Sequence, residues 1–242
     1  AEDLRLAMPV IARGDARDPW WTPAPFDTWP DDGRPVIGMT RETYGYAAHD
    51  EVLAGLERAA EALQDAGYQV EEIDTPDMSL PAQAWLQVAV YELRETLADV
   101  IDNHCSESLQ QIFDWLYELG PVAGIGDYLP GMAKRTSYTR AWNETLARYP
   151  LILTPYLMRP VYDYDYDAQS PENLADLFSS ACYSTGVNFL SLPAGVFPTG
   201  LAAGRPTGVQ LVGQRFREDL IIDAMQAVEE RLGALSHELW RR

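Results

Sequence analysis

The chain has 242 residues, 47% hydrophobic and 11% aromatic, enough to bury a sizeable core as one large domain or two small ones. Its 37 acidic and 18 basic residues give a formal net charge of −19, which disfavours nucleic acid and anionic membranes as partners. Its apolar runs are far shorter than the roughly 20 residues that span a bilayer, and we expect no signal peptide in its first residues, which lack a basic and a long apolar region.

The chain starts without an initiator methionine, so we expect its beginning to be processed or cut from something longer. Two cysteines, Cys105 and Cys182, allow one disulfide at most. This cysteine usage favours a reduced, cytoplasmic protein.

The first third of the chain predicts two helices and two strands. Apolar residues at helical spacing predict a helix over residues 1–13, and a connection rich in Pro, Gly and Asp follows over 14–35, packed on a surface. The clearest helix covers residues 49–66. It lies between two short strands, "PVIGMTRE" (35–42) and "YQVEEID" (68–74), whose order favours parallel pairing with a right-handed crossover. The apolar face of that helix consists of Val52, Leu56, Ala59, Leu63 and Ala66.

The remainder alternates helices and strands. Residues 81–149 are helical nearly throughout, with interruptions expected near residues 120–126 and near Pro130. A strand is predicted over 151–155 and a helix over 171–184. Two apolar runs follow, and a final helix is expected to bury Ile221, Met225, Val228 and Leu232. The runs cover 190–198 and 208–212, and nine residues join them, which suits antiparallel neighbours. The whole order predicts an α/β fold with a mixed sheet.

No complete catalytic motif stands out. The G-x-S-x-G elbow, the S-x-x-K pair and glycine-rich nucleotide loops are absent. Lys134, the only lysine, and Ser137 could share a helix face, but a helical lysine is far more often solvated than catalytic. His104 and Cys105 are adjacent and would point about 100° apart on a helix. Both cysteines are expected in the core, and His49 on the surface.

The run "YDYDYD" (162–167) invites comparison with a calcium loop. Its three aspartates imitate the first ligands, but Ala168 and Leu174 stand where such a loop needs Gly and Glu. Period two instead predicts an edge strand or loop with three tyrosines packed on one side. We therefore assign no metal site.

One pattern near the C-terminal end is more specific. This pattern, N-x-L-x-x-P-A-G, begins at Asn188. After a short loop containing Gly and Pro, it is followed by "GVQLVG" (208–213) and a helix. The pattern resembles the amidase signature hydrolases. The segments "AEDLRLAMPVIARGDARDPWW", "RPVIGMTRE", "ALQDAGYQVEEID" and "RYPLILTP" are similar to that family's second half, in the same order. The pattern itself, N-x-L-x-x-P-A-G, stands here as Asn188, Leu190, Pro193, Ala194 and Gly195.

The resemblance implies that residues 1–242 are the C-terminal part of a single amidase signature domain, with helices on both faces of its mixed sheet. It further implies hydrolysis of a carboxylic amide through an acyl-enzyme, without metal or organic cofactor. Family members use a Ser nucleophile, a bridging Ser and a Lys, all in the first half of the domain. This sequence holds neither that lysine nor the serine-rich signature, so we assign none of its residues a catalytic role.

A sheet divided between two halves leaves an unpaired edge and an apolar face. We therefore expect a partner: the N-terminal half of the same amidase, carrying the Ser-Ser-Lys triad, as a separate chain, a cleaved product or a preceding segment. The alternative is a non-catalytic α/β scaffold or interaction subunit that keeps the fold without activity.

The resemblance also points to substrate-binding residues, namely Phe178, Ala181 and Cys182. Seven residues before the motif's Asn188, glutamine-directed relatives carry an Asp that can pair with an α-amino group, whereas this chain has Ala181. Losing that charge-assisted bond removes roughly 1.5–3 kcal/mol from binding of an amino-acid amide. An apolar small-molecule amide, aromatic or aliphatic, is therefore expected. Asn188 is expected to orient the backbone at the strand start.

Overall fold

The computed structural model describes residues 1–24, 26, 33–120 and 124–240. Within these ranges, one mixed sheet has the strand order β2-β1-β3-β5-β4. β1 pairs in parallel with β2 and β3, whereas β5 pairs antiparallel with β3 and β4. The predicted α/β fold with a mixed sheet is therefore confirmed. The strands are β1 (Ile37–Met39), β2 (Val70–Glu72), β3 (Leu151–Pro155), β4 (Ala194–Ala202) and β5 (Arg205–Gly213).

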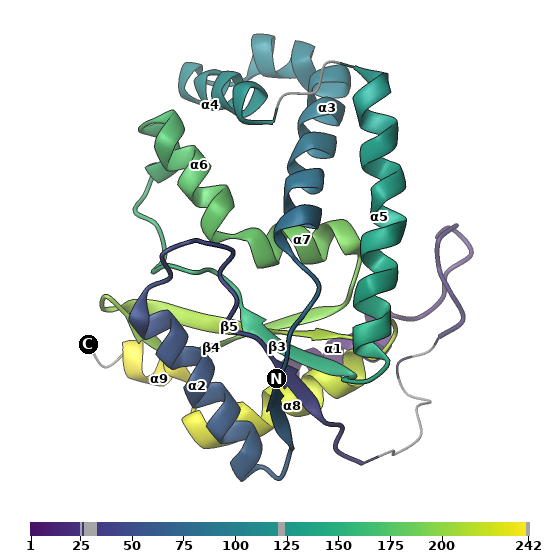
Figure 1. Cartoon of the computed structure of the whole chain (residues 1–242), viewed down its shortest axis with the longest axis vertical. Coiled ribbons are helices and arrows are strands. Elements are labelled where there is room, and N and C mark those ends of the chain that lie inside the picture. Colours follow the sequence, from purple (N-terminus) through teal and green to yellow (C-terminus); the bar gives the residue numbers. More distant parts are fainter. Residues whose placement is uncertain (25, 27–32, 121–123, 241–242) are drawn as a thin grey trace.

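Helices cover both faces of this sheet (Figure 1). α2 and α8 lie against one face, while α3 and α5 stand steeply on the other, with α4 at their far end and α6 and α7 beside them. The helices are α1 (Glu2–Ile11), α2 (Asp50–Asp65), α3 (Ser79–His104), α4 (Glu107–Leu119), α5 (Ile125–Leu146), α6 (Pro171–Ser180), α7 (Cys182–Leu190), α8 (Glu218–Leu232) and α9 (Leu235–Leu239), with a 3-10 turn η1 (Tyr166–Ala168).

The sheet separates two apolar clusters. On one side Leu56 of α2 and Met225 of α8 pack against the strands. On the other, Trp142 of α5 and Tyr183 of α7 are fully buried with Ile152 of β3. The three central strands are apolar because side chains on both their faces leave water. None of the described helices is long and apolar enough to cross a membrane.

The β1–α2–β2 unit follows the sequence prediction. The whole predicted apolar face of α2 is buried, and β1 pairs in parallel with β2. His49 begins the helix: its Nδ1 accepts a hydrogen bond from the backbone N–H of Glu51 at 3.3 Å. A capping side chain satisfies an N–H that has no partner inside the helix. His49 is therefore a structural cap at the surface rather than a ligand.

The hairpin of β4 and β5 contains the family-like motif. The antiparallel pairing is as expected, but the connection is much shorter than predicted, because Ala203 and Gly204 alone join the strands. Both residues have a positive φ (50° and 76°), which a tight hairpin turn requires. The segment expected to be a loop instead extends both β4 and β5, with a register irregularity between Pro198 and Gly200.

The two motif glycines explain how α8 packs. A Cβ added at Gly195 would lie 2.3 Å from Sδ of Met225 and 2.5 Å from Cγ2 of Ile221. A Cβ added at Gly213 would lie 2.7 Å from Cδ1 of Ile221. The missing side chains therefore let α8 approach both strands closely.

Three helix boundaries differ from the sequence predictions. The prediction of an interruption at Pro130 is wrong, because α5 continues through this residue. The helix tolerates the proline because, in the second turn, it removes only one helical hydrogen bond. A break that the sequence analysis did not predict separates α3 from α4, where Ser106 caps the new helix by accepting from the N–H of Leu109 at 3.3 Å. The single helix predicted over 171–184 is two helices, α6 and α7, which meet at Ala181.

Two apolar faces are more exposed than their spacing predicts. α1 forms, but none of its residues is buried, and Leu6, Val10 and Ile11 are 70–72% exposed. Leu232, expected on the buried face of α8, is 41% exposed in the last turn. In the described part of the 14–35 connection, Trp21 packs on Gly14 while Trp20 is exposed. The rest of that connection, at residues 25 and 27–32, lies outside the described residues.

The "YDYDYD" run forms a loop, one of the two predicted alternatives, but not all three of its tyrosines pack on one side. Tyr162 and Tyr166 stack with ring centroids 5.2 Å apart, but Tyr164 between them is 90% exposed. Asp165 adopts a left-handed conformation (φ 55°) and η1 follows, so alternation along an extended strand is lost. A turn of this kind brings residues four apart together.

Candidate functional site

A cavity of about 460 Å³ opens beyond the carboxyl ends of the parallel strands. The segments that follow β1, β2 and β3 all begin at that edge of the sheet. Residues 43–46, after β1, and the first turns of α3, after β2, form two of its walls, while α6 and α7 form another. Ligand sites in open α/β sheets commonly lie at this edge. The cavity is therefore the leading candidate for a binding site.

The described residues that line the cavity are uncharged. Among the described residues that line it, Leu86, Leu119 and Phe178 provide apolar surface and Tyr44 and Tyr46 add aromatic rings. Its polar groups are hydroxyls, amides and backbone, although 23% of the whole chain is charged. Such a site suits a neutral ligand with an apolar group and few hydrogen-bonding atoms.

Two of the three predicted substrate-binding residues line the cavity. Phe178, on α6, presents its ring between the cavity and Trp85, with ring centroids 6.2 Å apart. Cys182, the first residue of α7, also lines the cavity. Ala181 is buried at the junction of α6 and α7 and is not part of the lining. Whether Phe178 and Cys182 contact substrate remains a prediction.

The wall at residues 42–46 is held in place from within the core. Tyr183 of α7 donates a hydrogen bond to the backbone oxygen of Glu42 at 3.0 Å. The carboxylate of Glu42 accepts from the N–H groups of Thr43 and Tyr44 at 2.9 and 2.8 Å. Tyr44 has a positive φ of 52°, which is uncommon outside glycine and marks a shape imposed by its surroundings.

Burial makes the ionisable groups at this wall poor acids. It raises the pKa values of Tyr44 and Tyr183. The pKa of Tyr46 rises to about 12, through burial and through its hydrogen bond to Asp176. Burial likewise raises the pKa of the Cys182 thiol to about 12. These groups are therefore neutral near pH 7 and can act as hydrogen-bond donors or apolar surface, but not as nucleophiles.

The serine and threonine hydroxyls of the cavity mainly serve the local backbone. Ser179 and Thr185 donate to the carbonyl oxygens of Ala175 and Ala181, one turn earlier, and Ser79 donates to Asp77 at 2.7 Å. Lys134 and Ser137 are both exposed on α5, and no hydrogen bond joins them. Within the described ranges, the cavity lining thus holds no nucleophile paired with a base.

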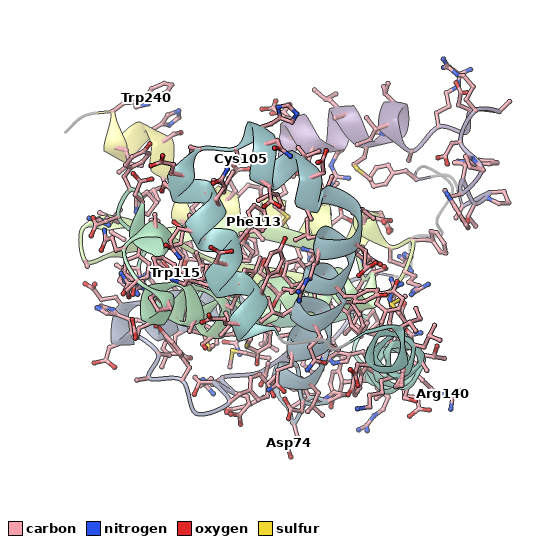
Figure 2. The ribbon with its side chains drawn as sticks, turned by 90° about the horizontal axis from the view of Figure 1, so that it is seen from above. Asp74, Cys105, Phe113, Trp115, Arg140 and Trp240 are labelled. Carbon is pink, nitrogen blue, oxygen red and sulfur yellow. The ribbon has the colours of Figure 1, made fainter. Side chains whose placement is uncertain are left out.

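The three histidines do not add a base to the cavity. His49 caps α2, while His104 ends α3 and His237 lies in α9. No group of three or more potential metal-ligating side chains occurs in the described part of the chain. Both cysteines are free, Cys182 buried and Cys105 half-buried at the end of α3 (Figure 2).

A second, more open hollow of about 710 Å³ lies beside α5 and contains three arginines. Two of them stabilise the end of α7: Arg135 donates to the carbonyl oxygen of Phe189 at 2.5 Å and Arg215 to that of Leu190 at 3.2 Å. Arg140 projects from α5 into solvent (Figure 2). Cations at a helix C-terminus satisfy its free carbonyls, so this hollow has a structural explanation.

The sequence profile of the amidase family matches residues 1–222, and the chain belongs to this family. The fold, with its mixed sheet between two helical layers, is that of amidase signature enzymes.

Individual relatives agree with this assignment. The indoleacetamide hydrolase of Bradyrhizobium japonicum is 32% identical over 239 residues, which are 98% of this chain and 51% of that protein. A glutamyl-tRNA(Gln) amidotransferase subunit of Heliobacterium modesticaldum is 25% identical, over 97% of this chain and 53% of that protein. A solved structure of a variant of Kluyveromyces lactis allophanate hydrolase has a TM-score of 0.72 at 18% identity, covering 95% of this chain and 38% of that one. The chain thus spans about half the length of the curated relatives it matches.

The sequence analysis did not identify most of the cavity wall. Tyr44, Tyr46 and Leu86 lie in segments far from the motif, and only the fold brings them to Phe178. One signal was available: "TYGY" (43–46) directly follows a buried parallel strand, and such loops commonly carry binding residues. The pairing of Arg159 with Asp176 had no comparable signal.

Proposed function

We propose that this chain provides the acyl-binding pocket of an amidase acting on a neutral, apolar carboxamide, with an aromatic acyl group as the preferred class. One observation carries the proposal: the lining of the cavity is uncharged and largely aromatic or aliphatic in its described residues. Its volume of about 460 Å³ lies within the range of small-molecule sites. A charged acyl group would lose its hydration there without gaining a counter-ion.

Two further points support an aromatic substrate. Phe178 and Tyr46 face the cavity from different elements, so a flat ring would find aromatic surface on two sides. A relative with 32% identity is named indoleacetamide hydrolase, and indoleacetamide is an amide with an aromatic ring. Ala181 supplies no carboxylate for an α-amino group, which disfavours glutamine and its derivatives.

The chemistry would be acyl transfer in two steps. A serine oxygen attacks the amide carbon, the C–N bond breaks, and the nitrogen leaves as ammonia or an amine after taking a proton. Water then cleaves the acyl-serine ester to release the carboxylic acid. We assign the Ser-Ser-Lys groups to an N-terminal half of the same amidase, because the described residues around the cavity hold no activated nucleophile. The proposed compartment is the cytoplasm.

The surface offers places where such a half could pack. β4 is an edge strand of the described sheet, and Val196 on it is 43% exposed. α1 exposes Leu6, Val10 and Ile11. Open strand edges and contiguous apolar side chains commonly mark surfaces that another polypeptide covers.

The test is reconstitution with that first half. The complex should hydrolyse indole-3-acetamide and phenylacetamide with a kcat/KM at least about 100-fold above that for glutamine, since one lost charge-assisted bond and one filled apolar pocket give about 3 kcal/mol. A serine-directed reagent should add one acyl or phosphonyl group to the first half and none to this chain. The same complex with the reactive serine replaced by alanine is the control.

The second candidate is a non-catalytic scaffold subunit. The observation that favours it is the absence of a base-activated nucleophile among the described residues of the cavity. A complex that forms tightly but neither hydrolyses amides nor reacts with the serine reagent would establish this alternative.

A further inference from the structure

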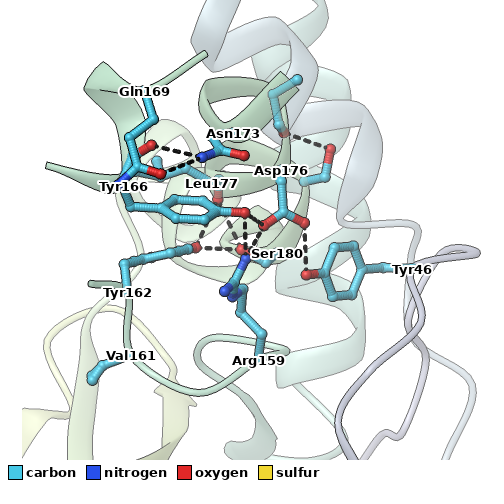
Figure 3. A network of polar contacts seen from close by, with 12 residues as sticks. Tyr46, Arg159, Val161, Tyr162, Tyr166, Gln169, Asn173, Asp176, Leu177 and Ser180 are labelled. Carbon is cyan, nitrogen blue, oxygen red and sulfur yellow. Dashed lines mark hydrogen bonds and ion pairs between the residues drawn. The ribbon is translucent and has the colours of Figure 1, made fainter. Parts of the chain in front are cut away.

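A cluster of charged and polar side chains surrounds the hydroxyl of Tyr46, a residue that lines the cavity (Figure 3). The carboxylate of Asp176, on α6, pairs with the guanidinium of Arg159, and both side chains are about three-quarters buried, with 28% and 26% exposed. Tyr46 donates a hydrogen bond to Oδ1 of Asp176, and Tyr166 donates one to Oδ2, each at 2.8 Å. Asp176 is thus satisfied at both oxygens.

The cluster ties the segment after β1 to the loop and helix that follow β3, 130 residues away between Tyr46 and Asp176. Tyr46 follows β1, Arg159 and Tyr166 follow β3, and Asp176 belongs to α6. Arg159 lies 4.9 and 4.5 Å from the ring centroids of Tyr162 and Tyr166, so its position is fixed by aromatic contacts as well as by charge. Nε of Arg159 is buried without a hydrogen-bond partner, whereas both oxygens of Asp176 have partners, so the carboxylate is the member of the cluster held in one geometry.

Of the described members of this cluster, Tyr46 alone lines the cavity. Tyr46 is part of the lining, and its hydroxyl points to the carboxylate of Asp176, which is not part of the lining (Figure 3). The position of the ring is therefore set by a group that the ligand does not touch. The backbone of the same loop is held by separate bonds, such as that from the N–H of Tyr46 to the oxygen of Thr43 at 2.9 Å.

We propose that Asp176 is a positioning residue that holds the Tyr46 ring as a fixed wall, and that this wall selects the acyl group by its fit against Phe178. The inference rests on the proposed amidase function for its substrate, but not for the anchoring of the loop. It predicts that loosening the anchor weakens binding of a ring that fills the cavity and spares a small amide that does not reach Tyr46.

Asp176→Asn is the informative variant because it keeps the size of the side chain. The oxygen of the new side-chain amide can accept a hydrogen bond from Tyr46 or from Arg159. Its NH2 group then faces the other donor and cannot accept from it, so one of the two bonds is lost. In the complex with the first half, KM for phenylacetamide should rise about tenfold with kcat changed less than about twofold. KM for acetamide should stay within about twofold of the wild-type value. Tyr46→Phe, which removes only the hydroxyl, should change KM in the same direction.

The matched control is Asp219→Asn. Asp219 pairs with Arg217 at 2.9 Å, at a comparable burial, at the start of α8 on the opposite face of the sheet. This variant should leave both KM values unchanged. In Asp176→Asn, an equal rise in KM for phenylacetamide and acetamide, or a fall in kcat alone, would overturn the positioning role and indicate general damage to the fold.

Hydrogen exchange separates this inference from the proposed function. Without any ligand, the backbone amide hydrogens of Tyr46, Ala48 and His49 should exchange with solvent at least about fivefold faster in Asp176→Asn than in the wild type. In Asp219→Asn their exchange rates should not change. If the wild-type complex hydrolyses no amide, the proposed function fails, but the hydrogen-exchange rates still test whether Asp176 anchors Tyr46. Unchanged exchange in Asp176→Asn refutes the inference whatever the activity.

Discussion

Tyr183 and Glu42 lie 141 residues apart in the chain, yet the buried hydroxyl of Tyr183 donates to the backbone oxygen of Glu42 at 3.0 Å. This bond joins α7, which contains the family motif's first residues, to the loop that walls the cavity. The ring of Tyr183 also packs against Tyr44, with centroids 5.7 Å apart. The wall of the site is thus attached to the core rather than free at the surface.

Tyr183→Phe should lower the free energy of unfolding by about 1–3 kcal/mol, because the oxygen of Glu42 loses a buried donor while the ring volume is kept. Urea unfolding followed by circular dichroism measures this change. Tyr164→Phe, at a residue that is 90% exposed, is the control and should change stability by less than about 0.5 kcal/mol. Equal effects of both variants would contradict the role of this bond.

Gly195→Ala should destabilise the protein by about 1–3 kcal/mol, because the added methyl group would overlap Met225 and Ile221. Gly126→Ala is the comparison within a helix: a Cβ there meets no atom of the described residues within 4 Å, so this variant should be neutral or slightly stabilising. Thermal unfolding of both variants checks the pair. A neutral Gly195→Ala would show that α8 can shift at no cost.

Cys182 should resist alkylation in the folded chain. With a pKa of about 12, roughly one thiol in 10⁴ is ionised at pH 8, and the side chain is buried. Iodoacetamide at pH 8 should therefore modify the half-buried Cys105 first, as read by peptide mass spectrometry. Complete modification of Cys182 before unfolding would show that the cavity opens far more widely than this structure indicates.

Asp176 should make stability depend on pH in the acid range. Burial opposes its charge, but hydrogen bonds from Tyr166, Tyr46 and Arg159 outweigh burial and hold its pKa below the ordinary 3.8. A lowered folded-state pKa stabilises the protein above 3.8 and this stabilisation is lost as pH falls through the lowered value.

The difference in unfolding free energy between wild type and Asp176→Asn should accordingly be largest at neutral pH and shrink below about pH 4. Urea unfolding at pH 7, 5, 4 and 3 measures it. Asp219→Asn serves again as the control. A difference that grows on acidification would mean that the carboxylate is not stabilised by its partners.

Local patterns in the sequence predicted much of the fold. The apolar stripe of α2, the β1–α2–β2 unit and the mixed sheet followed from spacing alone, because side-chain periodicity is fixed by helix and strand geometry. The motif around Gly195 was enough to indicate the family. Phe178 and Cys182 were identified through that resemblance, and they do line the cavity.

Other features could not be predicted from residue type and spacing. Pro130 lies within α5 although its residue type predicts a break, and Ala181 divides one predicted helix into two. The apolar face of α1 is exposed although its spacing predicts burial, because burial requires a partner surface that spacing does not specify.

The sequence by itself determined the layer architecture, the family and the lack of an evident catalytic constellation within these residues. Only the tertiary structure decided which side chains share the cavity and that Asp176 contacts Tyr46. The physical reason is the range of the interactions: helix and strand patterns arise between residues a few positions apart. The hydrogen bond between Tyr46 and Asp176 joins residues 130 positions apart, and no local pattern encodes their meeting.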